Sequence, residues 1–234
     1  MLPFRPALFL FPAGLLLCIS CAEAPVKEKV IDTLIIAGKT YDIHTYTPEA
    51  FDHLPSSGPE RLVDRNENIQ YEDSSKAKRV DKTLVLKTVD GKEVILANTF
   101  AGEGMEDYTR YIYVGSMKTI ACWYVDVYEY ESYHGLLIDQ RNGQQTEMWN
   151  KPRLSPDLKH FIVANLDLDA AFTPNGFQLW ELTDDGPKKI WEREFEGWGP
   201  DDVRWVDNNT IAFVKTYHGT DGFDKHEFRK MKLF

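Results

Sequence analysis

Cysteine is scarce in this chain, and its scarcity limits how the protein is stabilised. The 234 residues contain three cysteines, Cys18, Cys21 and Cys122. The first two lie in a segment that we expect to be processed, which leaves Cys122 alone in the folded part. A single cysteine forms no intramolecular disulfide and no cysteine cluster for zinc. The fold must therefore be stabilised by its hydrophobic core, with Cys122 as a buried, inert thiol in the apolar run IACWYV.

Catalytic and cofactor motifs are missing as well. The sequence contains no GxSxG, no P-loop and no GxGxxG. None of the six histidines forms an HxH or HExxH pair. We therefore predict no cofactor, no metal and no identifiable catalytic residue. A carboxylate pair for glycoside hydrolysis remains an alternative, because such a pair is recognised by the distance between its carboxyl groups, which the sequence does not give.

Two acidic segments are candidate metal sites. His218 and His226 bracket a glycine-rich segment with two aspartates, and Asp167 and Asp169 form a DxD pattern. Calcium needs several oxygens in one loop, and the twelve-residue EF-hand pattern is absent. A turn and a solvated strand end are the preferred interpretations.

Positive charge is in short supply. Lysine and arginine number 27 against 37 acidic residues, which gives a net charge of −10. An acidic surface repels phosphate backbones and anionic lipid head groups. We therefore exclude nucleic acid as a partner, and we expect membrane contact only through a lipid anchor.

The long apolar run of the chain lies at the N-terminus. Arg5 precedes an apolar stretch from Ala7 to Ile19 that is too short to span a membrane, the layout of a secretory signal. The segment CISC resembles a bacterial lipobox, with Ser20 before the acceptor Cys21 and Cys18 where leucine is more common. This resemblance implies lipidation at Cys21 and a membrane-anchored lipoprotein of the bacterial cell envelope. Ordinary secretion and an uncleaved anchor remain alternatives.

The remaining chain divides into three parts by composition. Residues 21–29 form a tether after the signal peptide 1–20. Residues 30–82 contain an N-terminal hairpin and a long polar loop. Residues 83–234 form the main domain.

The main domain has the pattern of an all-β, antiparallel fold. Apolar strands flank Asp90-Gly91, Asn142-Gly143 and Asp185-Gly186, which predict three hairpins because Asx-Gly pairs supply the positive φ values of tight primed turns. Pro156-Asp157 recurs as Pro200-Asp201, 44 residues later. A period of this length with four strands per unit is typical of propeller blades.

The repeat carries a family resemblance. SPDLKHFIVA resembles the S-P-D-G repeat of TolB-type β-propellers, with Leu158 at the position where that motif prefers glycine. PDDVRWVDNNTIAFV resembles a degenerate second copy. The resemblance implies propeller-like blade repeats in which the motif forms the turn into an inner strand, and it implies no activity. The chain is long enough for at most about five blades, closed by pairing first and last strands. A small β-barrel or sandwich is the alternative.

One strand has a chemically distinctive face. In CWYVDVYEYESYHG, alternation places Trp123 on one face with two valines. It places the following residues on the other: Tyr124, Asp126, Tyr128 and Tyr130. Phenols with a carboxylate suit stacking and hydrogen bonding to a glycan or an envelope protein. The competing interpretation is that these tyrosines pack against the neighbouring blade.

These features lead to three functional hypotheses. The first is a lipid-anchored envelope binding or scaffolding module. The second is an envelope hydrolase acting on a glycan or peptide, and the third is a structural envelope protein without a small ligand. An enzyme requires titratable groups that converge on a cavity, whereas a binding face does not.

Overall fold

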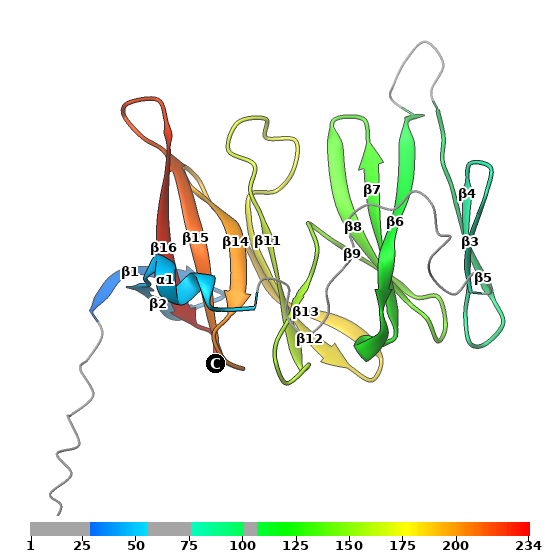
Figure 1. The fold of residues 1–234 in the computed structure, drawn as a ribbon, viewed down its shortest axis with the longest axis horizontal. Coiled ribbons are helices and arrows are strands. Elements are labelled where there is room, and N and C mark those ends of the chain that lie inside the picture. The colour runs from blue at the N-terminus through cyan, green and yellow to red at the C-terminus, as the bar shows by residue number, and fades with distance from the viewer. Residues whose placement is uncertain (1–28, 56–75, 101–106) are drawn as a thin grey trace, which may run out of the picture.

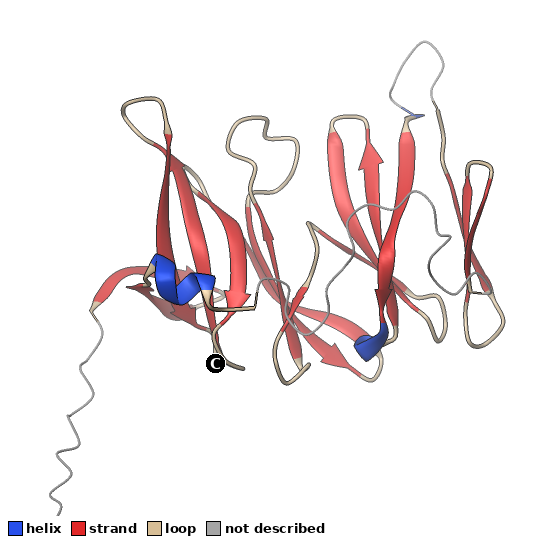
Figure 2. Cartoon of the chain, viewed as in Figure 1, coloured by secondary structure: helices blue, strands red, loops and turns tan. Residues whose placement is uncertain are grey.

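The computed structural model describes residues 29–55, 76–100 and 107–234. The described chain consists mainly of antiparallel strands in four sheets, none of which is closed (Figures 1 and 2). The all-β, antiparallel class predicted from the sequence is confirmed. The predicted signal peptide, most of the predicted tether and Cys21, where lipidation is predicted, lie outside the described residues.

Three of the sheets are meanders of consecutive strands. Sheet I contains β3 (Ala77–Val80), β4 (Thr83–Lys87) and β5 (Glu93–Ala97). Sheet II contains β6 (Thr109–Met117), β7 (Cys122–Glu129), β8 (Ser132–Asp139) and β9 (Gln145–Met148). Sheet III contains β10 (Arg153–Leu154), β11 (His160–Asn165), β12 (Gly176–Thr183) and β13 (Gly186–Glu194).

Sheet IV combines strands from both ends of the described chain. Its order is β1 (Val30–Ile36), β2 (Lys39–Thr45), β16 (Asp224–Lys232), β15 (Thr210–His218) and β14 (Gly199–Trp205). Two short helices, α1 (Pro48–Asp52) and the 3₁₀ turn η3 (Lys118–Ile120), complete the described elements. β2 pairs with β16 at Arg229↔Thr45, so strands from the two ends of the described chain share one sheet, although no sheet is closed.

The four sheets lie side by side in the order IV, III, II, I (Figure 1). A separate hydrophobic cluster fills each gap. Phe213 of sheet IV meets Phe177 of sheet III with ring centroids 5.2 Å apart. Another cluster joins sheets III and II, and a third joins sheets II and I. Sheets II and III are therefore buried on both faces.

The three predicted hairpins are present, but their turns differ from the prediction. φ is positive at Gly91, Gly143 and Gly186, whereas neither Asp90 nor Asn142 has a positive φ. A primed two-residue turn of the Asx-Gly type needs positive φ at both central positions. The glycines are still required, since each occupies a left-handed conformation that other residues adopt at a cost.

The first copy of the predicted repeat is a turn, and the second is not. Ser155 and Leu158 close a turn between β10 and β11, and Leu158 has φ of 59°. This left-handed value explains why the motif prefers glycine at that position. Pro200 and Asp201 lie inside β14, so the prediction that the second copy of the motif forms a turn is wrong. The structurally equivalent turn is 206–209, between β14 and β15.

The predicted start of the main domain also needs correction. β3 pairs with β4 through residues on both sides of Thr83, such as Val80↔Thr83. A boundary at Thr83 therefore divides sheet I. The N-terminal hairpin is likewise part of sheet IV, because β2 shares hydrogen bonds with β16.

Candidate binding surfaces

The predicted tyrosine face is mostly interior. Tyr124 is 0% exposed and Asp126 is 1% exposed, while Tyr128 is half-buried and Tyr130 is 44% exposed. The alternation along β7 is present, since Trp123 packs towards sheet I and Tyr124 packs towards sheet III. Tyr124 and Asp126 do not form an exposed binding surface, because sheet II has a neighbouring sheet on each side.

The buried part of this face forms a polar connection between sheets II and III. The Tyr133 hydroxyl donates to Asp126 at 2.7 Å and lies 3.4 Å from the Asn150 side-chain oxygen. Asn150 donates to Asn165 at 3.2 Å. Burial, and then the negative charge of Asp126, raise the pKa of Tyr133 well above its usual range. Asp126 and Asn165 are buried within this connection, whereas Tyr133 and Asn150 are half-buried.

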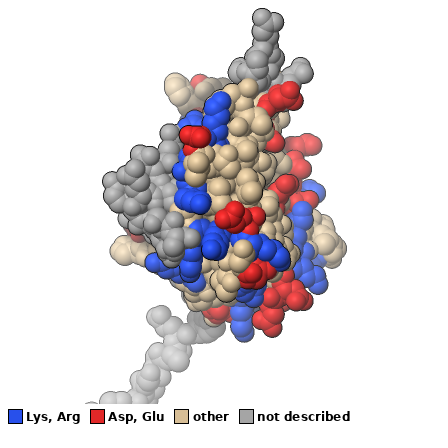
Figure 3. Space-filling view, turned by 90° about the vertical axis from the view of Figure 1, so that its right-hand side faces the viewer, with Lys and Arg blue, Asp and Glu red and all other residues tan. Residues whose placement is uncertain are grey.

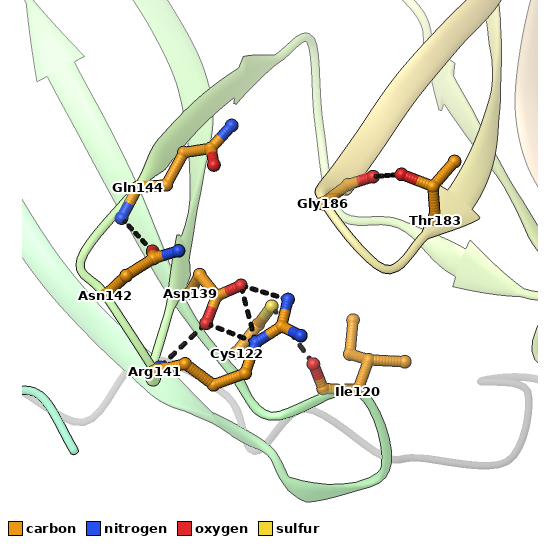
Figure 4. A network of polar contacts seen from close by, with 8 residues as sticks. All are labelled: Ile120, Cys122, Asp139, Arg141, Asn142, Gln144, Thr183 and Gly186. Atoms are coloured by element: carbon orange, nitrogen blue, oxygen red, sulfur yellow. Dashed lines mark hydrogen bonds and ion pairs between the residues drawn. The ribbon is translucent and has the colours of Figure 1, made fainter. Parts of the chain in front are cut away.

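Cys122 is buried, as predicted (Figure 4). Its Sγ donates to the carbonyl of Ile120 at 3.3 Å. Next to it, Arg141 forms a bidentate contact with Asp139, whose carboxylate is nearly buried. The tip of the β12–β13 hairpin at Gly186 approaches Gln144 here, so this polar cluster lies where sheets II and III meet.

The two candidate metal segments, around Asp169 and around His218, lie next to each other in the structure. His218 Nδ1 lies 2.9 Å from Asp224, and its Nε2 lies 3.0 Å from Asp169. The two carboxylates lie on opposite edges of the ring and do not share one coordination point. Within the described ranges, no group of three or more His, Cys, Asp or Glu residues is arranged to hold a metal ion.

Part of the outer face of sheet IV is covered, whereas Ile35 on β1 is 67% exposed. α1 inserts Phe51, which is 2% exposed, against the side of β15 that carries Ala212 and Val214. The Arg204 guanidinium fixes the helix by donating to the carbonyl of Phe51 at 3.0 Å and by lying 4.2 Å from its ring. A helix therefore covers the β15 part of this end of the row of sheets.

The outer face of sheet I has no such cover from the described residues. Alternation along β4 and β5 turns Leu84, Leu86, Val94 and Leu96 towards sheet II. The opposite positions form cross-strand rows on the outer face, Lys78–Val85–Ile95 and Val80–Thr83–Ala97. Ile95 is 62% exposed and Val80 is 52% exposed. We call these six positions the sheet I outer face.

Sheet I also differs from the rest of the protein in charge. Residues 76–100 contain six basic and three acidic residues, a balance of +3, whereas the whole chain carries −10. The view onto this end shows uncharged surface with Lys and Arg side chains beside it, and Asp and Glu side chains also border it (Figure 3). The sequence already contained the pattern of this exposed face, in the alternating residues of KAKRV, TLVLK and EVILA. The predicted domain boundary at Thr83 separated the first of these strands from the other two.

A pocket lies at another part of the molecule, between the β11–β12 loop 166–175 and residues 194–197. Its volume is about 540 Å³. Within the described part of the chain, no helix is long and apolar enough to cross a membrane.

Comparisons with protein-family models, with curated proteins and with solved structures found no match to this chain.

Proposed function

We propose that the protein is a lipid-anchored envelope scaffolding module that docks an acidic partner protein through the sheet I outer face. The observation that carries this proposal is the difference between the two ends of the row of sheets. α1 covers the β15 part of the sheet IV end, whereas no helix of the described chain covers the sheet I end, which exposes Val80 and Ile95 beside lysines. Exposed apolar residues gathered on one face, with polar residues around them, are typical of interaction surfaces.

Charge defines the partner. Lys78 lies within the face, and Lys87 extends beside it on β4, opposite Glu93 of β5. A local balance of +3 on an acidic protein attracts an acidic surface and disfavours a second copy docked face to face, since two basic faces repel. The partner surface is therefore acidic, with an apolar centre that covers Val80 and Ile95.

The proposed lipid anchor orients the sheet I outer face away from the membrane. Cys21 is the proposed acceptor, and a short tether leads from it to β1 in sheet IV. Sheet I lies at the opposite end of the row (Figure 1). The anchor thus holds the sheet IV end near the membrane and presents the sheet I outer face to envelope proteins.

The architecture is proposed to be propeller-like. Sheets II and III are four-stranded meanders, and β10 begins at Arg153, 44 residues after β6 at Thr109. First and last strands share sheet IV. These features support TolB-type blade repeats, in which each sheet packs face to face on its neighbours.

The hydrolase alternative has less support. Asp167, in the described pocket, accepts hydrogen bonds from four consecutive backbone N–H groups at 2.8–3.1 Å and from the Thr173 hydroxyl. A carboxylate engaged in this way organises its loop and is poorly placed to transfer a proton.

Site-specific photo-crosslinking in intact cells tests the docking surface. A photoreactive residue at position 95 should give one discrete protein adduct, and the adduct should fade when Lys78→Glu and Lys87→Glu are added. The matched control is position 190, an exposed isoleucine on β13 that is 42% exposed. Equal adducts from both positions, or an adduct at 95 that survives charge reversal, contradict the proposal. Crosslinking of position 95 to anionic lipid instead of protein identifies a membrane surface and also contradicts it.

Metabolic labelling tests the anchor separately. Radiolabelled palmitate should enter the wild type and not Cys21→Ala, and the variant should leave the membrane fraction. Cys122→Ala is the control, because a buried cysteine should not accept lipid. Equal labelling of the wild type and Cys21→Ala contradicts lipidation at Cys21.

A further inference from the structure

We propose that the pocket between loop 166–175 and residues 194–197 binds a small organic cation that carries an apolar group. Its volume of about 540 Å³ lies within the usual range for small-molecule sites, roughly 300–1,000 Å³. Among its lining residues are Phe172, Pro174, Glu194, Phe195 and Glu196. None of these belongs to sheet I, so the site is independent of the proposed docking surface.

The pocket wall is held in one conformation by two side chains. The Asp167 carboxylate accepts hydrogen bonds from the backbone N–H groups of residues 170–173. Asn175, which is 8% exposed, donates to the carbonyls of Phe195 and Trp198 at 3.0 and 2.9 Å and accepts from the backbone N–H of Asp167. The two segments that face each other across the pocket are therefore tied together. A preformed site loses little conformational entropy when a ligand binds.

The apolar part of the ligand is matched by aromatic rings. Phe172 is 54% exposed although the backbone around it is hydrogen-bonded to Asp167. On the opposite side, Phe195 stacks on Trp198 with ring centroids 4.0 Å apart, which fixes its orientation. An exposed ring on an ordered loop offers contact area at low entropic cost, and its face attracts a cation within about 6 Å.

The charge of the ligand follows from the carboxylates. Glu194 and Glu196 are exposed, and neither forms an ion pair with a cation of the described chain. Asp167 adds a third negative charge, although its oxygens are occupied by the loop backbone. A pocket with this charge repels anions and favours a ligand whose ammonium group reaches Glu194 or Glu196.

Titration of the full-length protein with phenethylammonium, followed by NMR shifts of the loop 166–175 amides, tests the proposal. 2-Phenylethanol has the same ring and chain length without the charge. We expect phenethylammonium to bind at least about tenfold more tightly than the alcohol, a difference typical of one charge-assisted contact. Glu194→Gln combined with Glu196→Gln should remove this preference, and Phe172→Ala should weaken binding of both compounds.

The matched control is Glu181→Gln, which neutralises an exposed glutamate on β12 outside the pocket. It should leave both affinities unchanged. Because Glu194 and Glu196 are exposed, the double variant should melt at the wild-type temperature, which separates lost binding from lost folding. Equal binding of the alcohol, a preference that persists in the double variant, or no binding of the amine at roughly 10 mM would each overturn the proposal.

Discussion

Tyr124 shows how tightly single residues are constrained inside this protein. Its ring lies against Gly135 on the neighbouring strand, so that a Cβ at position 135 would be 2.1 Å from the Tyr124 hydroxyl oxygen. The hydroxyl is buried without a well-aligned hydrogen-bond partner, although Tyr133 and Asp126 are near enough to affect its ionisation. Burial, followed by these two neighbours, raises the pKa of Tyr124 well above its usual range. The residue acts as a packing element whose shape requires glycine beside it.

Gly135→Ala should therefore destabilise the protein through overpacking, by about 1–3 kcal/mol. Tyr124→Phe alone should change stability little, because it removes a buried hydroxyl that lacks an aligned partner. In the double variant, the loss of the hydroxyl should recover part of the cost of the alanine. Urea denaturation of the four proteins measures the coupling. Strictly additive effects would show that the two residues do not share this space.

At the scale of elements, loop 166–175 is held by hydrogen bonds within the loop and to neighbouring segments. Asp167 holds it from within, and Asn175 ties it to the β13–β14 connection. His218 adds an external brace, since it bridges Asp169 of the loop and Asp224 of β16. Hydrogen bonding to Asp224, followed by the charge of Asp169, raises the pKa of His218. These two contacts thus join sheets III and IV through the His218 imidazole.

The pH dependence of this brace has a definite sign. A raised folded-state pKa means that the contribution is fully present below the unfolded value of about 6.5 and is lost as the pH rises through the folded value. An NMR titration should therefore place the His218 pKa above about 6.5. Asp224→Asn and Asp169→Asn should each lower it.

Asp221→Asn is the control for this titration, because Asp221 pairs with Lys225 at 2.7 Å. It should leave the His218 pKa nearly unchanged. A histidine pKa that responds equally to all three variants would indicate a general charge effect and not the two contacts.

At the scale of the whole molecule, β16 holds the two ends of the chain together. It is an interior strand of sheet IV, paired with β15 along its whole length and with β2 at its C-terminal part. Met231 and Leu233 are 0% and 1% exposed in the cluster between sheets IV and III. The N-terminal hairpin has no other sheet partner among the described residues.

Removing residues 223–234 should therefore release the N-terminal hairpin, expose the edge of β15 and cause aggregation. Deletion of Phe234 alone is the control, because this residue follows β16 and is 41% exposed. Thermal melting and size-exclusion chromatography measure the outcome. A monomeric truncated protein with unchanged melting would show that β16 is dispensable.

The sequence by itself determined most strands of the main domain and the positions of its hairpins, but not their turn types or β3. Alternating apolar residues and Asx-Gly pairs depend on interactions within a few residues, so the hairpins at Gly91, Gly143 and Gly186 were predictable. The Ser155–Asp157 turn was predictable for the same reason. The second copy at Pro200 was not, because Pro and Asp also fit within a bulged strand such as β14, whose register shifts after Pro200.

Only the tertiary structure decided which strand faces become surface. β7 and β5 both have alternating faces, but Tyr124 is interior and Ile95 is exposed. The reason is that sheet II has two neighbouring sheets, whereas sheet I has one among the described residues. The stacking order of the sheets depends on contacts between distant segments, which local patterns do not encode. The same holds for the pocket, whose two walls are joined by Asn175 and Phe195 across a separation of 20 residues.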